Sequence, residues 1–223
     1  MNDTICTIPI TEVFEKTDGC PICNMRDTIE NRIIEYILGP AMMEPDVRIT
    51  SNKSGYCGTH LKMMQSRQSR LSLALILESH LDELSKNIKP NKPNKKALYK
   101  SVRIIETCFV CDKVEWGLSR LLKTLYRKYS EDMDFRNLFK KQEYICHPHV
   151  EMLLSQSTEV SKRYKEEWEK DITTLFQGYL ETLKTEIHKF TTMFDYRNQG
   201  ENADWGNSRD SIERTARFLT GRN

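Results

Sequence analysis

Six of the seven cysteines in this chain fall into a pattern that occurs twice, and this pattern constrains the fold more than any other feature. A Cys-x-x-Cys pair at 20–23 is matched by a second at 108–111, and a Cys-x-x-His pair at 57–60 is matched by another at 146–149. The order and the spacing are nearly the same in both copies. The simplest explanation is an internal duplication of about ninety residues.

The repeated residues are metal ligands by type and by spacing. A Cys-x-x-Cys turn directs two thiolates at one point, and a Cys-x-x-His pair adds a thiolate and an imidazole, which is the tetrahedral set that Zn²⁺ prefers. Four protein ligands leave no open position, as is typical of a structural site. We therefore expect two zinc ions, each bound within a single copy. The expected ligand sets are Cys20, Cys23, Cys57 and His60 in one copy, and Cys108, Cys111, Cys146 and His149 in the other.

Further residues near the motifs are candidates for a supporting role. His147 competes with His149 as a ligand, and the register of the first copy favours His149. An Asp-x-Arg pair precedes each Cys-x-x-His pair, and its side chains are expected either to support the metal ligands or to pack between helices. These pairs are Asp46 with Arg48 and Asp134 with Arg136. Cys6 lies outside the pattern and is expected to be a free thiol.

The composition favours a helical protein. Of 223 residues, 30% are charged, and there are only 9 glycines and 7 prolines. The net charge of +2 gives no general attraction to nucleic acid or membranes. No signal peptide is visible, and the longest apolar run, 71–77, is too short to cross a bilayer. We therefore predict a cytoplasmic protein, in which reduced thiols favour metal binding over disulfides.

Apolar residues recur at helical spacing in both copies and predict an all-α, internally duplicated protein with two Cys3His metal sites and long packed helices. Helices are expected at 24–38 and 112–129, followed by loops. Longer helices are expected at 61–88 and 150–194, with a short closing helix at 208–219. The predicted boundaries are 1–88 for the first metal-binding repeat, 89–97 for a Lys/Pro linker, 98–197 for the second repeat with its long helix, and 198–223 for the tail.

The motifs CPIC at 20–23 and GYCGTH at 55–60 resemble those of a bacterial family of unknown function, domain-of-unknown-function family 6062. Its members carry CPxC, then Gly-aromatic-CxxH, and a second copy further on. The segments 194–198 and 214–221 are also similar to landmarks of that family, so the resemblance covers nearly the whole chain. The second copy departs from the first, since CFVC at 108–111 lacks the proline and Ile145 precedes its third cysteine. The resemblance implies the architecture and no reaction or substrate.

Several functions are compatible with the motifs. The first is a non-enzymatic, zinc-binding module that presents its long helices to a protein partner or to another copy of itself, with no clear nucleic-acid signal. The second is a thiol redox enzyme or sensor using Cys20 and Cys23, which would require a strand before the motif and a sheet around it. The third is a metal-dependent hydrolase, which would need an open coordination position and a general base. An iron–sulfur protein is a further alternative.

Overall fold

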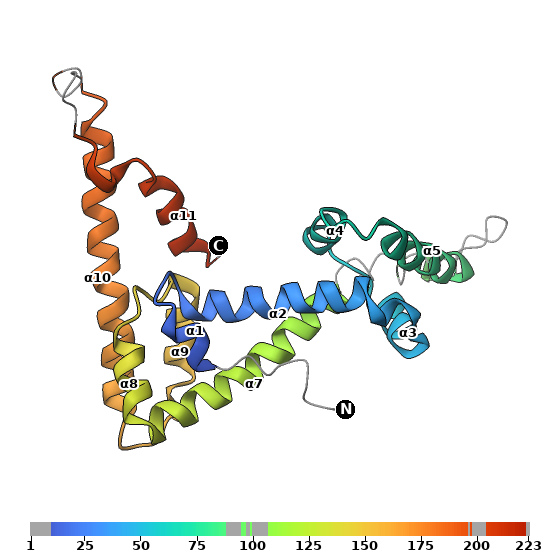
Figure 1. The fold of residues 1–223 in the computed structure, drawn as a ribbon, viewed down its shortest axis with the longest axis horizontal. Helices are drawn as coiled ribbons and strands as arrows, with labels where there is room; N and C mark the ends of the chain where they lie inside the picture. The colour runs from blue at the N-terminus through green and yellow to red at the C-terminus, as the bar shows by residue number, and fades with distance from the viewer. Residues whose placement is uncertain are drawn as a thin grey trace. The chain divides into compact units, whose positions relative to one another are not determined.

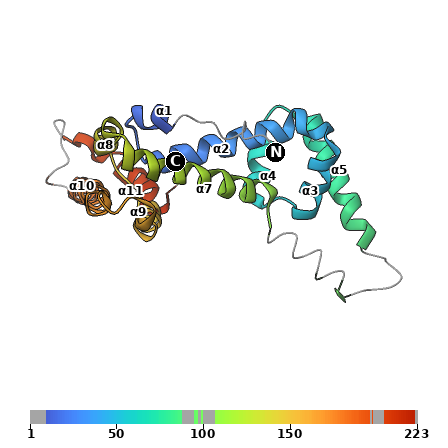
Figure 2. The same cartoon turned by 90° about the horizontal axis from the view of Figure 1, so that it is seen from below.

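The computed structural model describes residues 10–87, 95–96, 99, 107–195, 197 and 204–221. Within these residues every regular element is a helix, which confirms the all-α prediction. Two compact units are present (Figures 1 and 2). Unit 1 includes Thr28–Ser119, and unit 2 includes Ile8–Asp27 and Arg120–Asn223. The changes from one unit to the other fall inside two helices, whereas the expected linker at 89–97 lies mostly outside the described residues.

The elements follow one another along the chain in the order drawn in Figure 1. The first half contains α1 (Ile10–Glu15), α2 (Pro21–Leu38), η2 (Pro40–Met43), α3 (Pro45–Ser54), α4 (Gly58–Gln65) and α5 (Arg70–Asn87). The second half contains α7 (Phe109–Glu131), α8 (Met133–Lys140), α9 (His147–Ser155), η4 (Ser157–Glu159), α10 (Lys165–Thr192), η6 (Gly206–Ser208) and α11 (Ser211–Thr220).

The two expected long helices are each interrupted, so those predictions were wrong. The helix expected at 61–88 is divided into α4 and α5, because Arg67 leaves the helix and its guanidinium donates a hydrogen bond to Asn31 on α2. The helix expected at 150–194 is divided into α9, η4 and α10. At that interruption Val160 is extended, and the backbone N–H of Ser161 donates to the Ser130 hydroxyl instead of to a helical carbonyl.

Both expected loops contain a short helix. Pro45 stands at the start of α3, where its fixed φ and missing N–H suit a first turn. Gly55 ends α3 at a φ of 67°, a value that favours glycine. In the second loop, the Asp132 side chain accepts a hydrogen bond from the Phe135 backbone N–H and caps α8. Predicting loops here failed because these local signals start helices of only 10 and 8 residues.

Unit 2 has an aromatic core. Trp168 on α10 is fully buried, and its ring lies 4.8 Å from that of Tyr129 on α7 and 4.9 Å from that of Phe139 on α8. The Trp168 indole N–H donates to the Leu153 carbonyl on α9. Such burial of large rings with edge-to-face contacts is a main source of packing energy. Helices α9 and α11 pack against α10, as both views show (Figures 1 and 2).

The buried residues of unit 1 come mainly from α2 and its neighbours. Ile29, Ile33, Ile34 and Ile37 lie at helical spacing on α2 and are all buried, as the apolar periodicity indicates. Across the described residues, no helix is both long enough and apolar enough to span a bilayer.

Candidate metal centres

The eight expected ligands form two groups, and each group combines the Cys-x-x-Cys pair of one copy with the Cys-x-x-His pair of the other. We call them cluster A and cluster B. Cluster A, in unit 2, consists of Cys20, Cys23, Cys146 and His149. Cluster B, in unit 1, consists of Cys57, His60, Cys108 and Cys111. In each cluster all ligand atoms lie within 4.8 Å of one another. The eight residues are therefore brought together into two groups that could each hold a metal ion, but the prediction that each copy completes its own site was wrong.

The exchange has a simple geometric cause. Each Cys-x-x-Cys pair lies at the start of a helix, α2 or α7, that begins in one unit and ends in the other. The following Cys-x-x-His pair is reached only after further helical elements. The Cys-x-x-His pair of each copy therefore lies in the other unit from the Cys-x-x-Cys pair of that copy. Each Cys-x-x-Cys pair is completed by the Cys-x-x-His pair of the other copy.

Both clusters are built where two helices begin. The carbonyl oxygens of Cys20, Cys57, Cys108 and Cys146 accept the first helical hydrogen bonds of α2, α4, α7 and α9, at N···O distances of 3.1, 3.0, 3.0 and 3.0 Å. The second ligand of each pair follows one turn later. Helix N-termini carry a partial positive charge, which stabilises the thiolate forms that bind metals. Two such N-termini meet at each cluster.

The sulfur–sulfur spacing in the clusters is close to that around one tetrahedral zinc ion, whereas the shortest sulfur–nitrogen distances, 3.0 Å in cluster A and 3.1 Å in cluster B, are below it. Bond lengths of about 2.3 Å to sulfur and 2.0 Å to nitrogen imply ligand-to-ligand distances of about 3.5–3.8 Å. In cluster A, the Cys23 Sγ lies 3.6 Å from the Cys146 Sγ and 3.4 Å from the His149 Nδ1, and the Cys20 Sγ lies 3.5 Å from the same nitrogen. In cluster B the distance from the Cys57 Sγ to the Cys111 Sγ is 4.0 Å. All six cysteines are unpaired, so no disulfide occupies either cluster.

The family model described as a family of unknown function, DUF6062, matches residues 1–223, which is the whole chain. The chain belongs to this family. The resemblance based on the CPxC and CxxH motifs is thereby confirmed. No curated protein and no solved structure gives a significant match. Because the family description names no activity, the function of this DUF6062 member has to be argued from its two clusters.

The surroundings of cluster A exclude solvent. All four ligands are buried, and the end of the C-terminal helix α11 lies against them. The Gly221 carbonyl accepts a hydrogen bond from the Cys23 thiol at 3.3 Å. Gly221 has a φ of 65°, and a Cβ placed there would lie 3.2 Å from the Cys146 Sγ. A glycine is therefore required both by the backbone and by the closeness of the cluster.

We expect Gly221→Ala to destabilise the protein by about 1–2 kcal/mol, from the cost of a left-handed non-glycine residue, and to loosen metal binding at cluster A. Thermal unfolding and zinc content measure the two effects. Gly178→Ala is the control, because it lies inside α10 with nothing within 4 Å of the added Cβ. That control should be neutral or slightly stabilising. Equal behaviour of the two variants would contradict the close packing of Gly221 on cluster A.

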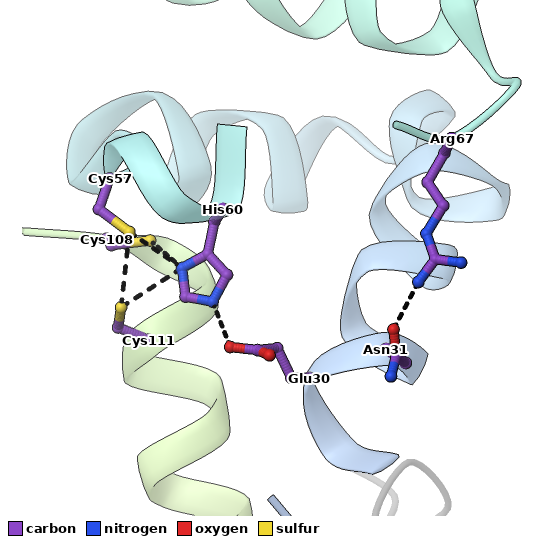
Figure 3. A network of polar contacts seen from close by, with 7 residues as sticks. All are labelled: Glu30, Asn31, Cys57, His60, Arg67, Cys108 and Cys111. Carbon is purple, nitrogen blue, oxygen red and sulfur yellow. Dashed lines mark hydrogen bonds and ion pairs between the residues drawn. The ribbon is translucent and has the colours of Figure 1, made fainter. Parts of the chain in front are cut away.

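Cluster B is more open and has a charged partner (Figure 3). His60 directs Nδ1 at the three cysteines, with 3.1 Å to the Cys57 Sγ, 3.2 Å to the Cys108 Sγ and 3.4 Å to the Cys111 Sγ. Its other nitrogen, Nε2, lies 2.7 Å from the Glu30 carboxylate on α2. Metal-bound histidines typically donate their second ring N–H to a carboxylate in this way, which orients the ring and increases its basicity.

Glu30 is not predictable from the sequence, because a single glutamate on a charged helix carries no local signal. We expect Glu30→Gln to weaken zinc binding at cluster B by about 10–100-fold, as is typical when such a partner is altered. Competition against a chelating dye measures the affinity. Glu35→Gln, at an exposed position of the same helix, is the matched control and should leave the affinity unchanged. An unchanged affinity in Glu30→Gln as well would remove Glu30 from the metal centre.

In each cluster the close packing of the candidate ligands shifts the pKa values of the thiols. In cluster B, burial raises the pKa of Cys108, but hydrogen bonds from His60 and from the backbone at Cys111 and Cys57, together with the charge of His60, bring that pKa down to about 6. Burial and the nearby charge of Cys108 raise the pKa of Cys111 to about 12. Burial lowers the pKa of His60, whereas Cys108 and Glu30 together raise it to about 10. The protein alone therefore stabilises one thiolate beside a positively charged histidine.

In cluster A, too, the pKa of one thiol is lowered and the pKa values of the other two are raised. Burial raises the pKa of Cys20, but hydrogen bonds from Cys146, Cys23 and His149 hold it well below its usual value. Hydrogen bonding to Cys146 and Cys20 raises the pKa of Cys23, and hydrogen bonding to Cys20 raises that of Cys146 to about 12. Three thiolates this close repel one another, and a divalent cation among them removes that repulsion.

The Asp-x-Arg pairs do not reach the clusters. Arg48 donates to the Leu75 carbonyl on α5. Arg136 is buried, donates to the Tyr129 carbonyl and lies 4.0 Å from the Tyr164 ring. Asp46 and Asp134 are exposed. The arginines connect helices to each other, so of the two expected roles the structure favours helix packing over support of the ligands.

The last candidates are the two neighbouring histidines, His147 and His149, and the cysteine outside the repeated pattern, Cys6. His149 lies in cluster A, whereas the neighbouring His147 is exposed and its ring faces that of Phe176 at 6.1 Å. Cys6 lies outside the described residues.

Proposed function

We propose that the protein binds one zinc ion in each cluster and that both ions are structural. The observation that carries this proposal is the repeated set of three thiols and one imidazole whose ligand atoms lie within 4.8 Å of one another. Each set would fill the coordination shell of zinc and leave no position for a substrate. In this role the ions join the N-termini of α2 and α9 in cluster A, and those of α4 and α7 in cluster B. The common construction of the clusters also supports an internal duplication.

Elemental analysis together with an absorption spectrum tests this proposal. We expect two zinc ions per chain and a colourless protein. A brown protein containing iron and sulfide would replace zinc by an iron–sulfur cluster. The small size of the clusters argues against that alternative, because several irons and sulfides would have to fit between ligand atoms that lie within 4.8 Å of one another. Protein without stoichiometric metal would overturn the proposal.

An enzymatic role for Cys20 and Cys23 has less support. Both side chains are buried, at 0% and 2% exposure, so a substrate disulfide has no access to them. The described residues contain no strand, whereas the redox motif needs a strand before its cysteines. A hydrolase would need an open metal position, which a four-ligand shell does not offer. The unpaired cysteines are compatible with a reducing compartment such as the cytoplasm.

We further propose that the zinc-stabilised helices bind another protein or a second copy of this chain. The supporting observation is that Leu71 and Leu81 on α5 are 72% and 63% exposed, so this helix presents apolar side chains to solvent. Light scattering over a range of concentrations tests self-association, with the double variant Leu71→Glu, Leu81→Glu as the comparison. A wild-type monomer at all concentrations would exclude a second copy as the partner.

A further inference from the structure

The two clusters differ sharply in their access to solvent. In cluster A every ligand is buried, and the most exposed of them, His149, reaches only 6%. In cluster B, His60 and Cys108 are buried, but Cys57 is half-buried and Cys111 is exposed. A dissolved small molecule can therefore reach sulfur atoms of cluster B and is kept from those of cluster A.

We propose that cluster B is a peroxide-sensitive site in which Cys57 and Cys111 form a disulfide and release the metal. This inference rests on the proposed zinc function. Zinc-bound thiolates keep their nucleophilic character, and oxidation selects those that solvent can reach. The sequence motif suggested thiol redox chemistry at Cys20 and Cys23. Their burial makes Cys57 and Cys111, at the starts of α4 and α7, the better candidates.

The geometry of cluster B suits this disulfide. The two sulfur atoms lie 4.0 Å apart and have to approach to about 2.05 Å. Cys111 lies in the first turn of the long helix α7, which holds it in place. Cys57 is the residue before α4 and follows directly on the turn at Gly55 and Tyr56, so its backbone is not yet fixed in a helix. Figure 3 shows both sulfur atoms on the same side of the His60 ring.

The reaction balances with hydrogen peroxide as the oxidant. The Cys111 thiolate attacks one peroxide oxygen, the O–O bond breaks and hydroxide leaves, which gives a sulfenic acid on Cys111. The Cys57 thiolate then attacks the Cys111 sulfur, the S–O bond breaks, and a second hydroxide leaves as the S–S bond forms. Two electrons pass from the thiolates to the peroxide, and two protons from solvent convert both hydroxides to water. The zinc ion keeps only His60 and Cys108, and is released.

The test begins with protein that contains two zinc ions per chain, treated with increasing hydrogen peroxide under native conditions. Zinc release is followed with a chelating dye, and disulfides are identified by peptide mapping after alkylation of free thiols. We expect loss of one of the two zinc ions together with a disulfide between Cys57 and Cys111, and its recovery after reduction with added zinc. Retention of both ions, loss of both together, or a disulfide within cluster A would overturn the inference while leaving the zinc proposal intact.

A variant that keeps the metal sharpens the test. Cys111→His retains a zinc ligand at an exposed position and removes the thiol that is attacked. It should bind two zinc ions and keep both in peroxide. If this variant does not bind its second zinc, the disulfide found by peptide mapping of the native chain still decides the case, and Cys6→Ser, which removes the thiol outside both clusters, should leave that result unchanged. Peroxide-induced release from zinc-loaded Cys111→His at the native rate would overturn the inference. Untreated protein that lacks zinc would instead contradict the proposed function.

Discussion

Replacing Cys146 by serine is expected to release the metal of cluster A and to loosen the first turn of α2, which is distant in sequence. Cys23 and Cys146 are separated by 123 positions, but their sulfur atoms lie 3.6 Å apart. Structural zinc supplies folding free energy that reaches about 10 kcal/mol or more in small zinc modules, so the loss of one ligand should lower thermal stability strongly. Hydrogen exchange should increase at 20–27 and 147–155, where the ligands of cluster A begin their helices.

The matched variant is Cys57→Ser, which should affect cluster B instead. Its increase in hydrogen exchange is expected at 58–65 and in the first turn of α7, with 20–27 unchanged. The pairing also predicts how variants combine. Cys23→Ser and Cys146→Ser should not add, because either removes the same ion, whereas Cys23→Ser and Cys57→Ser should be nearly additive. Loss of protection around Cys108 in the Cys146→Ser protein would contradict the pairing of the clusters.

The identity of the ligands could be predicted from the sequence because each pair lies within one helical turn. A cysteine at the start of a helix and a second ligand three residues later always project to the same end of that helix, whatever the rest of the fold does. Their grouping could not be predicted in this way. It depends on the unit in which each of α2 and α7 ends, and no local sequence pattern specifies that unit.

The helical class followed from the apolar periodicity, and the isoleucines of α2 are buried as that periodicity requires. The ends of the long helices did not follow, because apolar spacing continues through the interruptions at Arg67 and Val160. At these interruptions the chain forms tertiary hydrogen bonds, such as that from the Ser161 backbone N–H to the Ser130 hydroxyl. Bonds of this kind cannot be predicted from the local sequence. Glu30 could not be predicted for the same reason, since its contact with His60 forms only in the folded protein.

Removal of metal by a chelator is expected to proceed in two steps, with cluster B emptied first. The physical reason is access: a chelator has to displace ligands one at a time, and Cys111 is exposed, whereas cluster A is enclosed by the end of α11. Titration with a strong chelator, followed by native mass spectrometry and hydrogen exchange, should first yield a species with one zinc ion that has lost protection around α4 but not around α9.

Removal of the second zinc ion should unfold more of the protein than removal of the first. Cluster A lies beside the aromatic contacts of unit 2, where the ring of Tyr144 stacks on that of Tyr179 at 4.1 Å and lies 5.7 Å from that of Phe218 on α11. Without the metal, the lowered pKa of Cys20 leaves a thiolate beside two other thiols in this buried place, and no cation neutralises its charge, which favours separation of the helix ends. We therefore expect protection in α9 and α11 to fall together with the last zinc ion. In the Gly221→Ala protein the two steps should move closer together, because the enclosure of cluster A is then weakened while cluster B is unchanged. Removal of zinc from cluster A before cluster B would contradict the assignment of cluster A as the enclosed site.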